Sequence, residues 1–433
     1  MIVGSGLACA LLIGCFLVLV VLRIPVAFAL GLSTIPVVLL ELRLTPFIVL
    51  DRMFQSYNSF ILLAVPFFLL AANLMNSGKV TDRLIELARV MTGWMPGGLG
   101  HVNVAVSMLF AGISGSSTAD AAGCGKILIP AMQKEGYDTK FAVAITACSS
   151  VMGVIIPPAI LMIVWGGVMQ VSVGALFLGG AVPGLMIGLS LMATVYGFAK
   201  VRGYPISAKP NLAEFWSACK GAVLALLTPI FVIGGIVGGI VTPTESAIIA
   251  AGYSLILGMF VYRTVRVTDL GHILYDTARF AAISLFAIGT ASAFGWLLSF
   301  YNAPRLIVST MTALELGPFG TALIIASLFL VFGLFIDAIP TIIILGTVLM
   351  PVAQTAGIDP IAFAIIGIVS LAFGLVTPPY GLCLLISAAI GGLNVVQVIG
   401  DVAIILLPML LILLLIAAFP EIALWLPQTL MPG

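Results

Sequence analysis

Charged residues and histidines are scarce in this sequence of 433 residues. Charged side chains make up only 8% of it, and the net charge of +1 gives no electrostatic reason to expect nucleic acid as a partner. His101 and His272 are the only histidines and have no cluster of metal ligands beside them, which argues against a metalloenzyme. The Gly-rich phosphate loop of ATPases is absent, and no catalytic Ser, His and Asp arrangement can be argued. We therefore expect a protein that is not an enzyme and that needs no cofactor.

Cysteine pairs are lacking as well. The six cysteines show neither paired nor metal-like spacing, so they are most simply small apolar residues within helices. Hydrophobic residues, in contrast, make up 62% of the chain and gather in runs that approach the roughly 20 residues needed to cross a bilayer. These runs cover 7–22, 60–75, 141–156, 176–199, 221–240, 247–262 and 395–419. The composition therefore predicts an all-α polytopic membrane protein.

Two segments, 112–161 and 333–382, look like copies of one unit at a constant offset of 221 positions. The matched positions are Pro130, Gln133, Gly136, Asp138, Ser149, Gly153, Pro157 and Pro158 in the first copy, and Pro351, Gln354, Gly357, Asp359, Ser370, Gly374, Pro378 and Pro379 in the second. Because twice this offset approaches the full length, we predict a tandem duplication, with repeat one at 1–208 and repeat two at 209–433. Such internal repeats in a membrane protein are typical of secondary transporters.

Each repeat is predicted to hold five spans and one re-entrant hairpin, with one span broken at Pro-Pro. In repeat one the spans lie near 2–22, 24–41, 59–76, 141–171 and 174–199, and the hairpin (hairpin one) covers 97–137. In repeat two the spans lie near 221–240, 245–262, 280–300, 361–391 and 395–418, and the hairpin (hairpin two) covers 317–357. Because five is odd, the second copy must enter the membrane upside down, which gives an inverted repeat.

Basic residues gather on one side of this predicted topology. That side carries Arg23, Lys79, Arg83, Arg89, Lys134, Lys140, Lys200, Arg202, Lys209, Lys220, Arg263, Arg266 and Arg279, whereas the other carries only Arg43, Arg52 and Arg305. The basic side is expected to be the cytoplasm, so both termini lie outside, and hairpin one enters from the cytoplasm and hairpin two from outside. In the alternative topology each hairpin forms two full spans, which sends the polar stretch 114–120 to the far surface.

Three stretches, 43–58, 79–92 and 267–279, mix charged and apolar residues at helical spacing. Val80 and Leu84, for example, share one face of the second stretch, as in a helix that lies in the membrane interface. We expect amphipathic arms here, and ordinary polar loops are the alternative.

The tip of hairpin one, residues 112–120, gathers four hydroxyls, two glycines and one carboxylate between apolar segments. Non-helical backbone at membrane depth is tolerated only where it is buried in protein or lines a cavity. Its carbonyls and hydroxyls suit Na⁺, and the N-terminus of the next half-helix suits an anionic group of a substrate. The alternative is a small-residue motif that lets helices pack closely.

Each Pro-Pro pair interrupts a helix at the same repeat position, at 153–158 (break one) and at 374–379 (break two). Because proline has no N–H, carbonyls upstream of each pair lose their helical partners. A bound cation would satisfy these carbonyls, whereas a plain kink would be rescued by a neighbouring Ser or Thr. Two breaks at matching positions favour a pair of symmetry-related cation sites.

Two carboxylates, Asp120 and Asp337, are predicted at membrane depth, where a charge is costly and usually functional. Each could bind Na⁺, carry a proton or cap the half-helix that begins there. Glu245, close after Thr242 and Pro243, is expected to cap the N-terminus of a further helix.

Several motifs occur together along the chain: Arg23-x-Pro-Val-Ala, Met95-Pro-Gly-Gly, Gly115-Ser-Ser-x-Ala-Asp120, Ile156-Pro-Pro, Thr242-Pro-Thr-Glu245 and Thr377-Pro-Pro. With them the chain resembles, over essentially its full length, the large membrane subunit of tripartite ATP-independent periplasmic transporters. The resemblance implies Na⁺-coupled uptake of an organic acid anion, such as a C4-dicarboxylate or sialic acid, across the bacterial inner membrane by an elevator mechanism. It also implies two partners, a small four-helix membrane subunit and a periplasmic substrate-binding protein, besides the membrane lipid. The small subunit is expected to be a separate chain.

By the same resemblance, two cation sites fall on this sequence. Site one would use Ser114, Ser116 and Ser117 of tip one with Gly153, Ile156 and Pro157 of break one. Site two would use Gly333 and Asp337 of hairpin two with Gly374, Thr377 and Pro378 of break two. The substrate would lie between the tips, near Gly115, Thr118, Asp120, Pro158, Thr341 and Pro379. Because hairpin two lacks the serine-rich tip, the twin sites are not expected to be chemically equal.

The elevator mechanism divides the chain into two bodies. Segments 97–171 and 317–391 would move together, whereas 1–76, 174–199, 221–300 and 395–418 would form a fixed scaffold widened by the arms 43–58 and 267–279. A stand-alone Na⁺-coupled anion transporter or antiporter of similar architecture is the alternative. A channel is disfavoured, because the duplicated hairpins imply occluded sites rather than a continuous pore.

Overall fold

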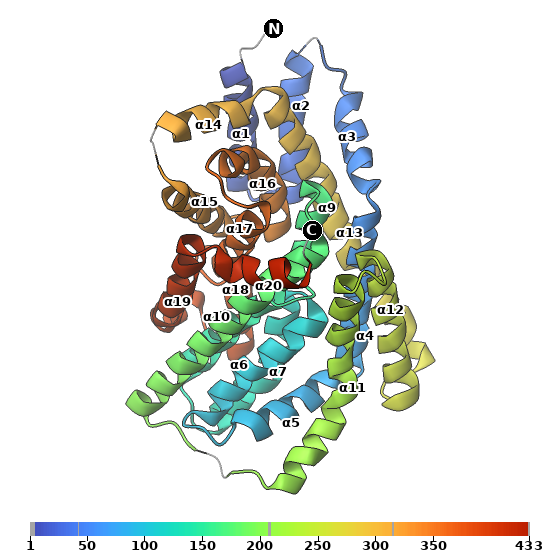
Figure 1. The fold of residues 1–433 in the computed structure, drawn as a ribbon, viewed down its shortest axis with the longest axis vertical. Helices are drawn as coiled ribbons and strands as arrows, with labels where there is room; N and C mark the ends of the chain where they lie inside the picture. Colours follow the sequence, from blue (N-terminus) through green and yellow to red (C-terminus); the bar gives the residue numbers. More distant parts are fainter. Residues whose placement is uncertain (1–4, 42, 207–208, 314–315, 432–433) are drawn as a thin grey trace.

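A computed structural model describes residues 5–41, 43–206, 209–313 and 316–431 (Figure 1). In repeat one the helices are α1 (Ser5–Val21), α2 (Val26–Leu40), α3 (Phe47–Tyr57), η1 (Phe60–Leu63), α4 (Ala64–Ser77), α5 (Val80–Thr92), α6 (Gly98–Ser114), α7 (Ser117–Lys134), α8 (Thr139–Ser150), η2 (Val151–Val154), α9 (Ile160–Met169) and α10 (Val173–Arg202). In repeat two they are α11 (Leu212–Val237), α12 (Pro243–Ile256), η3 (Leu257–Val261), α13 (Val267–Phe300), α14 (Ala303–Ala313), α15 (Pro318–Gly333), α16 (Ala338–Thr355), α17 (Pro360–Gly374), α18 (Leu382–Gly391), α19 (Val395–Ala418) and α20 (Glu421–Leu430). No β-strand occurs among the described residues.

The composition-based prediction of a polytopic membrane protein is confirmed. Seven segments of the described chain are long and apolar enough to cross a bilayer: Phe60–Ser77, Val173–Arg202, Leu212–Val237, Pro243–Val261, Val267–Phe300, Ala338–Thr355 and Val395–Ala418. Side chains on their outer faces are apolar yet exposed, as with Ile230 at 61% and Leu407 at 65%. Lipid, rather than water, is the solvent that suits such a surface.

The two predicted hairpins are present as pairs of short helices, α6 with α7 and α15 with α16. Their helices hold 16 to 18 residues. At about 1.5 Å per residue they are about 24–27 Å long, and α16 is itself one of the seven segments long enough to cross a bilayer, so helix length alone does not separate the re-entrant topology from full spans. Figure 1 shows α6 and α7 in the lower half of the molecule and α15 and α16 in the upper half. This placement is the one expected of hairpins that enter from opposite sides.

Each Pro-Pro pair interrupts a helix where the sequence predicts it. The first interruption separates α8 and η2 from α9, and the second separates α17 from α18. Both Pro-Pro peptide bonds are cis, at Pro157–Pro158 and Pro378–Pro379. The interrupted backbone therefore lies at equivalent places in the two repeats.

The helices outside the hairpins differ in part from the sequence-based expectation. Stretches 43–58 and 79–92 contain α3 and α5, as expected for amphipathic arms. Stretch 267–279, in contrast, is not a separate arm, because α13 runs without interruption from Val267 to Phe300. No proline falls within α13 to end the helix between the polar and the apolar part. Helices α14 and α20 were not predicted.

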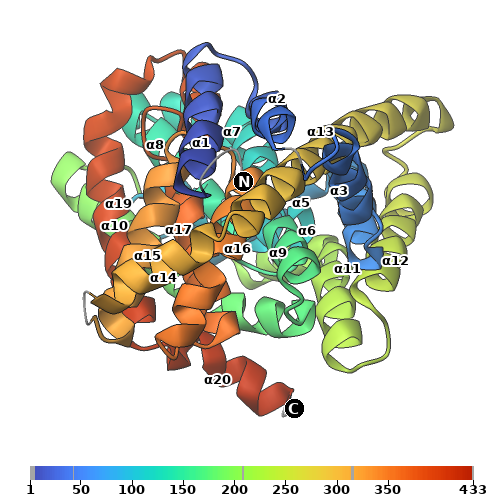
Figure 2. The ribbon, with the colours of Figure 1, turned by 90° about the horizontal axis from the view of Figure 1, so that it is seen from above.

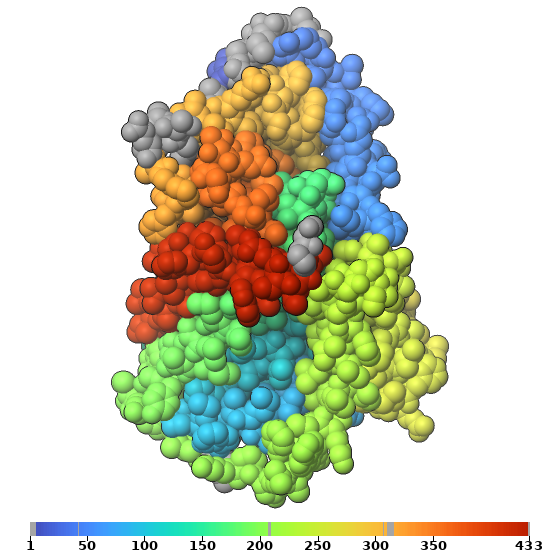
Figure 3. Space-filling view, in the orientation of Figure 1, coloured from blue at the N-terminus to red at the C-terminus, as the bar shows by residue number. Residues whose placement is uncertain are grey.

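The helices fall into two groups in space. Seen from above, α3, α11, α12 and one end of α13 lie on one side, and α10 and α19 lie on the opposite side (Figure 2). In the space-filling view, α19 and α20 form a red band across the middle of the face, between the second-repeat hairpin above and first-repeat elements below (Figure 3). The hairpin tips and the helix breaks come together between these groups, within a continuous buried core.

Candidate functional site

Tip one packs directly on break one. The backbone N–H of Ile160, just beyond the Pro-Pro pair, donates to the carbonyl of Gly115 at 3.1 Å. Gly115 has a φ of +61°, and a β-carbon placed on it would lie 2.8 Å from the carbonyl oxygen of Pro158. A residue with a side chain would be strained at this φ and would collide with the break. The glycine of the tip thus permits the contact between hairpin one and the broken helix.

Hydroxyl groups organise the backbone of tip one. Ser116 is the N-cap of α7 and accepts from the N–H of Ala119 at 3.4 Å. The hydroxyl of Ser114 accepts from the N–H of Ser116 at 3.3 Å and donates to the carboxylate of Asp120. The hydroxyls of Ser116 and Thr118 are 3.1 Å apart. The predicted polar residues of tip one therefore form one connected cluster.

Asp120 does not cap its helix, which was one of the three roles considered for it. Its side chain is fully buried, and Oδ1 accepts from Ser114, whereas Oδ2 has no hydrogen-bond partner. A β-carbon placed on Gly153 would lie 2.6 Å from this Oδ2, so the carboxylate faces the glycine of break one. The structure thus brings Asp120, which the sequence analysis placed among the substrate contacts, beside Ser114 and Gly153 of cation site one.

Break one leaves carbonyl oxygens without hydrogen-bond donors. Among the described residues, no hydrogen bond ends on the carbonyls of Gly153, Val154 or Ile156. The N–H of Ile156 bonds backward to Met152 at 2.8 Å, and the prolines that follow have no N–H to offer. These oxygens are available to a cation, as the sequence predicts.

The tip of hairpin two, residues 333–337 (tip two), meets break two through a similar contact. The N–H of Tyr380 donates to the carbonyl of Leu334 at 3.0 Å, as Ile160 does to Gly115 in repeat one. The backbones of Gly333 and Gly374 touch, because a β-carbon on Gly374 would lie 2.7 to 2.9 Å from backbone atoms of Gly333. A hairpin tip therefore packs on a broken helix in both repeats, although through residues at different repeat positions.

The second pair differs from the first in how its oxygens are used. The carbonyl of Gly374 accepts from the N–H of Thr377 at 3.1 Å, and that of Leu375 accepts from the N–H of Cys383 at 3.0 Å. The hydroxyl of Thr377 donates to the carbonyl of Phe373 at 2.7 Å. Break two thus satisfies internally several carbonyls of the kind that break one leaves free.

The tip of hairpin two also differs from that of hairpin one. Asp337 occupies the N-cap position of α16 without a capping hydrogen bond from its side chain, and it is only half-buried. Thr341 is fully buried, and its hydroxyl donates to the carbonyl of Asp337 at 2.9 Å. Pro378 and Pro379 lie in the interruption beside this tip.

Cys383 lies near tip one and break two, although the sequence analysis treated the cysteines only as small apolar residues within helices. It lies in α18, just after break two, and its thiol lies close to the hydroxyls of Ser117 and Ser150 in repeat one. The same thiol lies within electrostatic reach of both Asp120 and Asp337. Cys383 therefore marks where the two repeats meet, and no spacing pattern in the sequence could have indicated it.

A buried network of polar side chains joins α6 to α8, and the sequence analysis did not predict it. Asn103 of α6 donates to the hydroxyl of Thr146 at 2.7 Å and accepts from the hydroxyl of Ser149 at 3.0 Å. Ser107 donates to Ser149 at 3.0 Å. All four side chains are almost completely buried, so the network fastens α6 to α8 inside an apolar bundle.

Glu245 is a helix cap, as predicted. Its carboxylate accepts from the N–H of Thr242 at 2.7 Å, and the N–H of Glu245 donates to the hydroxyl of Thr242 at 3.3 Å. The two residues form a capping box at the start of α12, with Pro243 at its first position. Glu245 therefore has a structural role.

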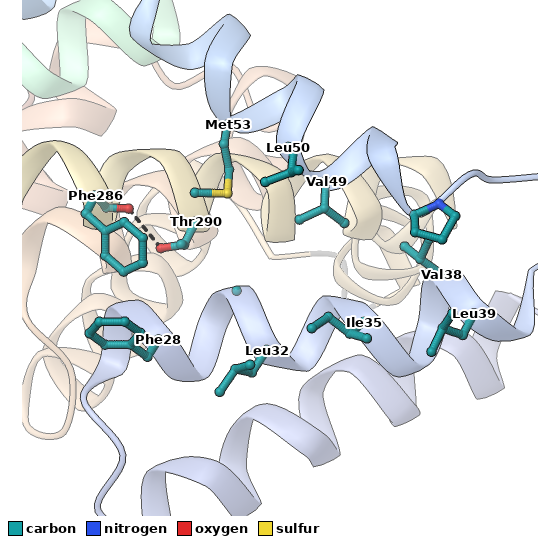
Figure 4. A pocket seen from close by; sticks show the side chains of 12 residues that line it. Phe28, Leu32, Ile35, Val38, Leu39, Val49, Leu50, Met53, Phe286 and Thr290 are labelled. Atoms are coloured by element: carbon teal, nitrogen blue, oxygen red, sulfur yellow. Dashed lines mark hydrogen bonds between the residues drawn. The ribbon is translucent and has the colours of Figure 1, made fainter.

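An apolar groove opens on the surface between α2, α3 and α13 (Figure 4). Its volume is about 400 Å³, and Leu32 and Ile35 of α2 face Leu50 and Met53 of α3 across it. Helix α3 has no buried residue, and its Phe54 is 69% exposed. The groove therefore lies along the arm predicted at 43–58.

Residues 13–422 match the family described as "Tripartite ATP-independent periplasmic transporter, DctM component". The sialic acid TRAP transporter permease protein SiaT of Haemophilus influenzae is 36% identical over 433 residues, covering 99% of this chain and 69% of that protein. The sialic acid large permease SiaM of Vibrio cholerae is 37% identical over 378 residues, covering 87% and 88%. The C4-dicarboxylate large permease DctM of Pseudomonas aeruginosa is 36% identical over 379 residues, covering 88% and 89%. These relatives are named as transporter permeases, as expected for a chain that is not an enzyme.

Two solved structures share the fold. The YdaH transporter of Alcanivorax borkumensis matches with a TM-score of 0.64 and 14% identity over 87% of each chain. MtrF of Neisseria gonorrhoeae matches with a TM-score of 0.57 and 14% identity over 87% of this chain and 84% of that one. MtrF is described with a class of antimetabolite efflux pumps.

Proposed function

The chain belongs to the DctM family, the large permease component of tripartite ATP-independent periplasmic transporters, and on that premise we propose that it carries an organic acid anion inward by Na⁺ coupling. It is a multi-pass protein of the bacterial inner membrane. Sialic acid and C4-dicarboxylates are the substrates named for its relatives, and they define the class we propose. The observation that carries the proposal is the pair of matching contacts between a hairpin tip and a broken helix.

The two cation sites of the proposal lie at these contacts. Site one combines the tip hydroxyls of Ser114, Ser116 and Ser117 with the free carbonyls around Gly153 and Ile156. Site two combines the tip at Gly333–Asp337 with Gly374, Thr377 and the backbone before Pro378. Oxygen ligands from broken helices are the usual means of holding Na⁺ in such transporters.

The substrate is proposed to lie between the two tips, at the half-helix N-termini. The first turn of α7 follows Ser116 and that of α16 follows Asp337, so unpaired backbone N–H groups begin at both places. These N–H groups carry the positive end of the helix dipole, which favours a carboxylate. Thr118 and Thr341 add hydroxyls in the same two turns.

Alternating access is proposed to occur by motion of the hairpins and broken helices as one body. Packing favours adding α10 to this body, whereas the sequence-based division placed 174–199 in the scaffold. A β-carbon on Gly180 would lie 2.5 Å from the carbonyl oxygen of Ile155, and one on Gly184 would lie 2.5 Å from the side chain of Ile156. If α10 stayed fixed while break one moved with the hairpins, these close contacts would have to be broken.

The same reasoning extends to α19, which the sequence-based division also placed in the scaffold at 395–418. Arg202 at the end of α10 bonds to both carboxylate oxygens of Asp401 in α19, at 2.6 and 2.9 Å. It also reaches Asp138 at the start of α8, at 3.3 Å. The proposed scaffold then consists of α1 to α5 and α11 to α14.

The proposal includes a small membrane subunit and a periplasmic binding protein as partners. The groove between α2, α3 and α13 is apolar and faces outward from the scaffold, so it is the surface we assign to the small subunit (Figure 4). Arg43 and Arg305 lie on the side predicted to face the periplasm, where the binding protein would dock.

Reconstituted uptake tests the proposal. The purified chain is placed in proteoliposomes with and without its small subunit and binding protein, and uptake of labelled sialic acid or C4-dicarboxylate is measured under an inward Na⁺ gradient. We expect saturable uptake only with both partners present and with Na⁺ outside. Ser117→Ala and Thr377→Ala each remove one oxygen ligand and are expected to raise the Na⁺ requirement about tenfold, which corresponds to about 1.4 kcal/mol. Uptake by the chain alone would favour the stand-alone carrier, and uptake indifferent to Na⁺ would contradict the coupling.

A further inference from the structure

The carboxylate of Asp120 is buried at membrane depth with one oxygen unpartnered. Its side chain is 0% exposed, and Oδ2 accepts no hydrogen bond. The ion pairs found among the described residues involve Glu41, Asp138, Asp276 and Asp401, but not Asp120. An isolated ionised carboxylate costs several kcal/mol in a low-dielectric interior. In its ionised form the group therefore requires a positive partner from outside the chain, whereas a protonated carboxyl would not.

The surroundings of Oδ2 supply further ligands for such a partner. This oxygen lies against Gly153, where the carbonyls of Gly153 and Val154 receive no hydrogen bond from the described residues. The hydroxyl of Ser114 donates to Oδ1 of Asp120, so that Oδ2 is the oxygen that faces break one. A carboxylate and carbonyls together form an oxygen-only set, which is the chemistry that a hard monovalent cation prefers.

Repeat two does not reproduce this arrangement. The position that matches Asp120 at the repeat offset is Thr341, a neutral residue whose hydroxyl is engaged with the carbonyl of Asp337. The carbonyls of Gly374 and Leu375 already accept from N–H groups. Site two therefore offers fewer free carbonyl oxygens at its break, and its own carboxylate, Asp337, is only half-buried at the N-cap of α16.

We propose that Asp120 is the anionic ligand of cation site one and that site one binds Na⁺ more tightly than site two. This inference rests on the proposed function, because it names the charge of a site that the coupling requires. It changes the role of Asp120 from a substrate contact to a cation ligand. The pairing of Na⁺ with this carboxylate also lets the cation enter the membrane interior without net charge at the site.

Na⁺ binding to the purified chain in detergent tests the inference without any transport. The melting temperature is followed as NaCl replaces choline chloride at constant ionic strength, because a ligand that binds the folded state stabilises it by an amount that grows with the logarithm of its concentration over its Kd. Asp120→Asn keeps the shape and still accepts from Ser114, so it removes mainly the charge. We expect the Na⁺ concentration that produces a given rise in melting temperature to increase at least about tenfold. Asp359→Asn, at the exposed N-cap of α17, is the matched control and should respond as the wild type does.

Two further variants make the outcome decisive. Gly153→Ala keeps the carboxylate but displaces it, since the new β-carbon would lie 2.6 Å from Oδ2, and it should weaken Na⁺ binding even if Asp120→Asn fails to fold. Thr377→Ala at site two should have the smaller effect. Wild-type Na⁺ affinity in Asp120→Asn or in Gly153→Ala would overturn the inference, and so would a larger loss in Thr377→Ala. A wild-type protein without any Na⁺ response would overturn the proposed coupling and the inference together.

Discussion

The contact between Gly333 and Gly374 makes a quantitative prediction about hairpin two. Gly374→Ala would place a β-carbon 2.7, 2.8 and 2.9 Å from three backbone atoms of Gly333. Backbone cannot rotate away as a flexible side chain does, so α15 and α17 must move apart. Overpacking of this kind costs about 1–3 kcal/mol. The intrinsic preference of a helix for alanine returns at most about 1 kcal/mol, and subtracting it leaves a net loss of up to about 2 kcal/mol.

Gly333→Ala is the matched control from the other side of the same contact. Its β-carbon would lie 3.3 to 3.4 Å from the nearest atoms, one of which belongs to the side chain of Leu371. Small shifts of the neighbouring atoms can relieve contacts at these distances. The preference of a helix for alanine over glycine then offsets the remaining strain, and the net change in the free energy of unfolding is expected to be near zero. Both glycines end a helix, which makes the two substitutions comparable.

Thermal unfolding of the two variants in detergent provides the measurement. Gly374→Ala should melt up to about 2 °C below the wild type, whereas Gly333→Ala should melt close to it. The same preparations also report the Na⁺ response, which should weaken in Gly374→Ala because tip two is pushed from break two. Equal melting temperatures for the two variants would refute the packing argument, since only their different β-carbon distances separate them.

Two other predictions concern the topology and the cytoplasmic end of the bundle. Cys219, in the basic region before α11 enters the membrane, should react with an impermeant thiol reagent only from the cytoplasmic side, and a cysteine in place of Arg305 only from outside; labelling of Cys219 in intact cells would reverse the orientation. Arg202→Ala leaves Asp401 without its partner at only 12% side-chain exposure, so thermal unfolding should show a loss of about 1–3 kcal/mol. Arg202→Lys should recover only part of it, because lysine cannot bond to both oxygens in the same geometry, and full stability in the alanine variant would speak against the role of the ion pair.

The sequence predicted the features that depend on local backbone chemistry. A Pro-Pro pair removes two N–H groups wherever it occurs, so both breaks could be placed from Pro157 and Pro378 alone. The cap formed by Glu245 with Thr242 follows from short-range hydrogen bonds in the same way, whereas the cap of α7 is Ser116 rather than Asp120, which the sequence analysis had considered. The constant offset between the repeats then located hairpin two, although its tip has a different composition.

Features that depend on long-range packing could not be predicted. Cys383 lies close to Ser117 and Ser150, which are distant from it in the sequence, and only the fold brings these residues together. The network around Asn103 likewise uses residues that a composition-based analysis counts as ordinary small polar side chains. The continuity of α13 was missed because charge patterning marks a change of environment, which a helix can cross without a break.

The division of the chain into a moving body and a scaffold also depends on long-range packing, so the sequence could not predict it. Hydropathy identifies α10 as a span but gives no information on its neighbours. The close approach of Gly180 to Ile155 and the bonds from Arg202 to Asp401 are what favour its assignment to the moving body.

A cross-link between the two proposed bodies tests the elevator most directly. Gly295 of α13 and Thr347 of α16 are in contact, since a β-carbon on Gly295 would lie 3.3 Å from the hydroxyl of Thr347. The double-cysteine variant at 295 and 347 is made in a background without reactive native cysteines. Na⁺-driven uptake is measured before and after cross-linking and again after reduction, so that the reduced protein is its own control. We predict that the link between 295 and 347 stops uptake and that its reduction restores uptake. Full uptake with the link complete would contradict the motion of one body against the other.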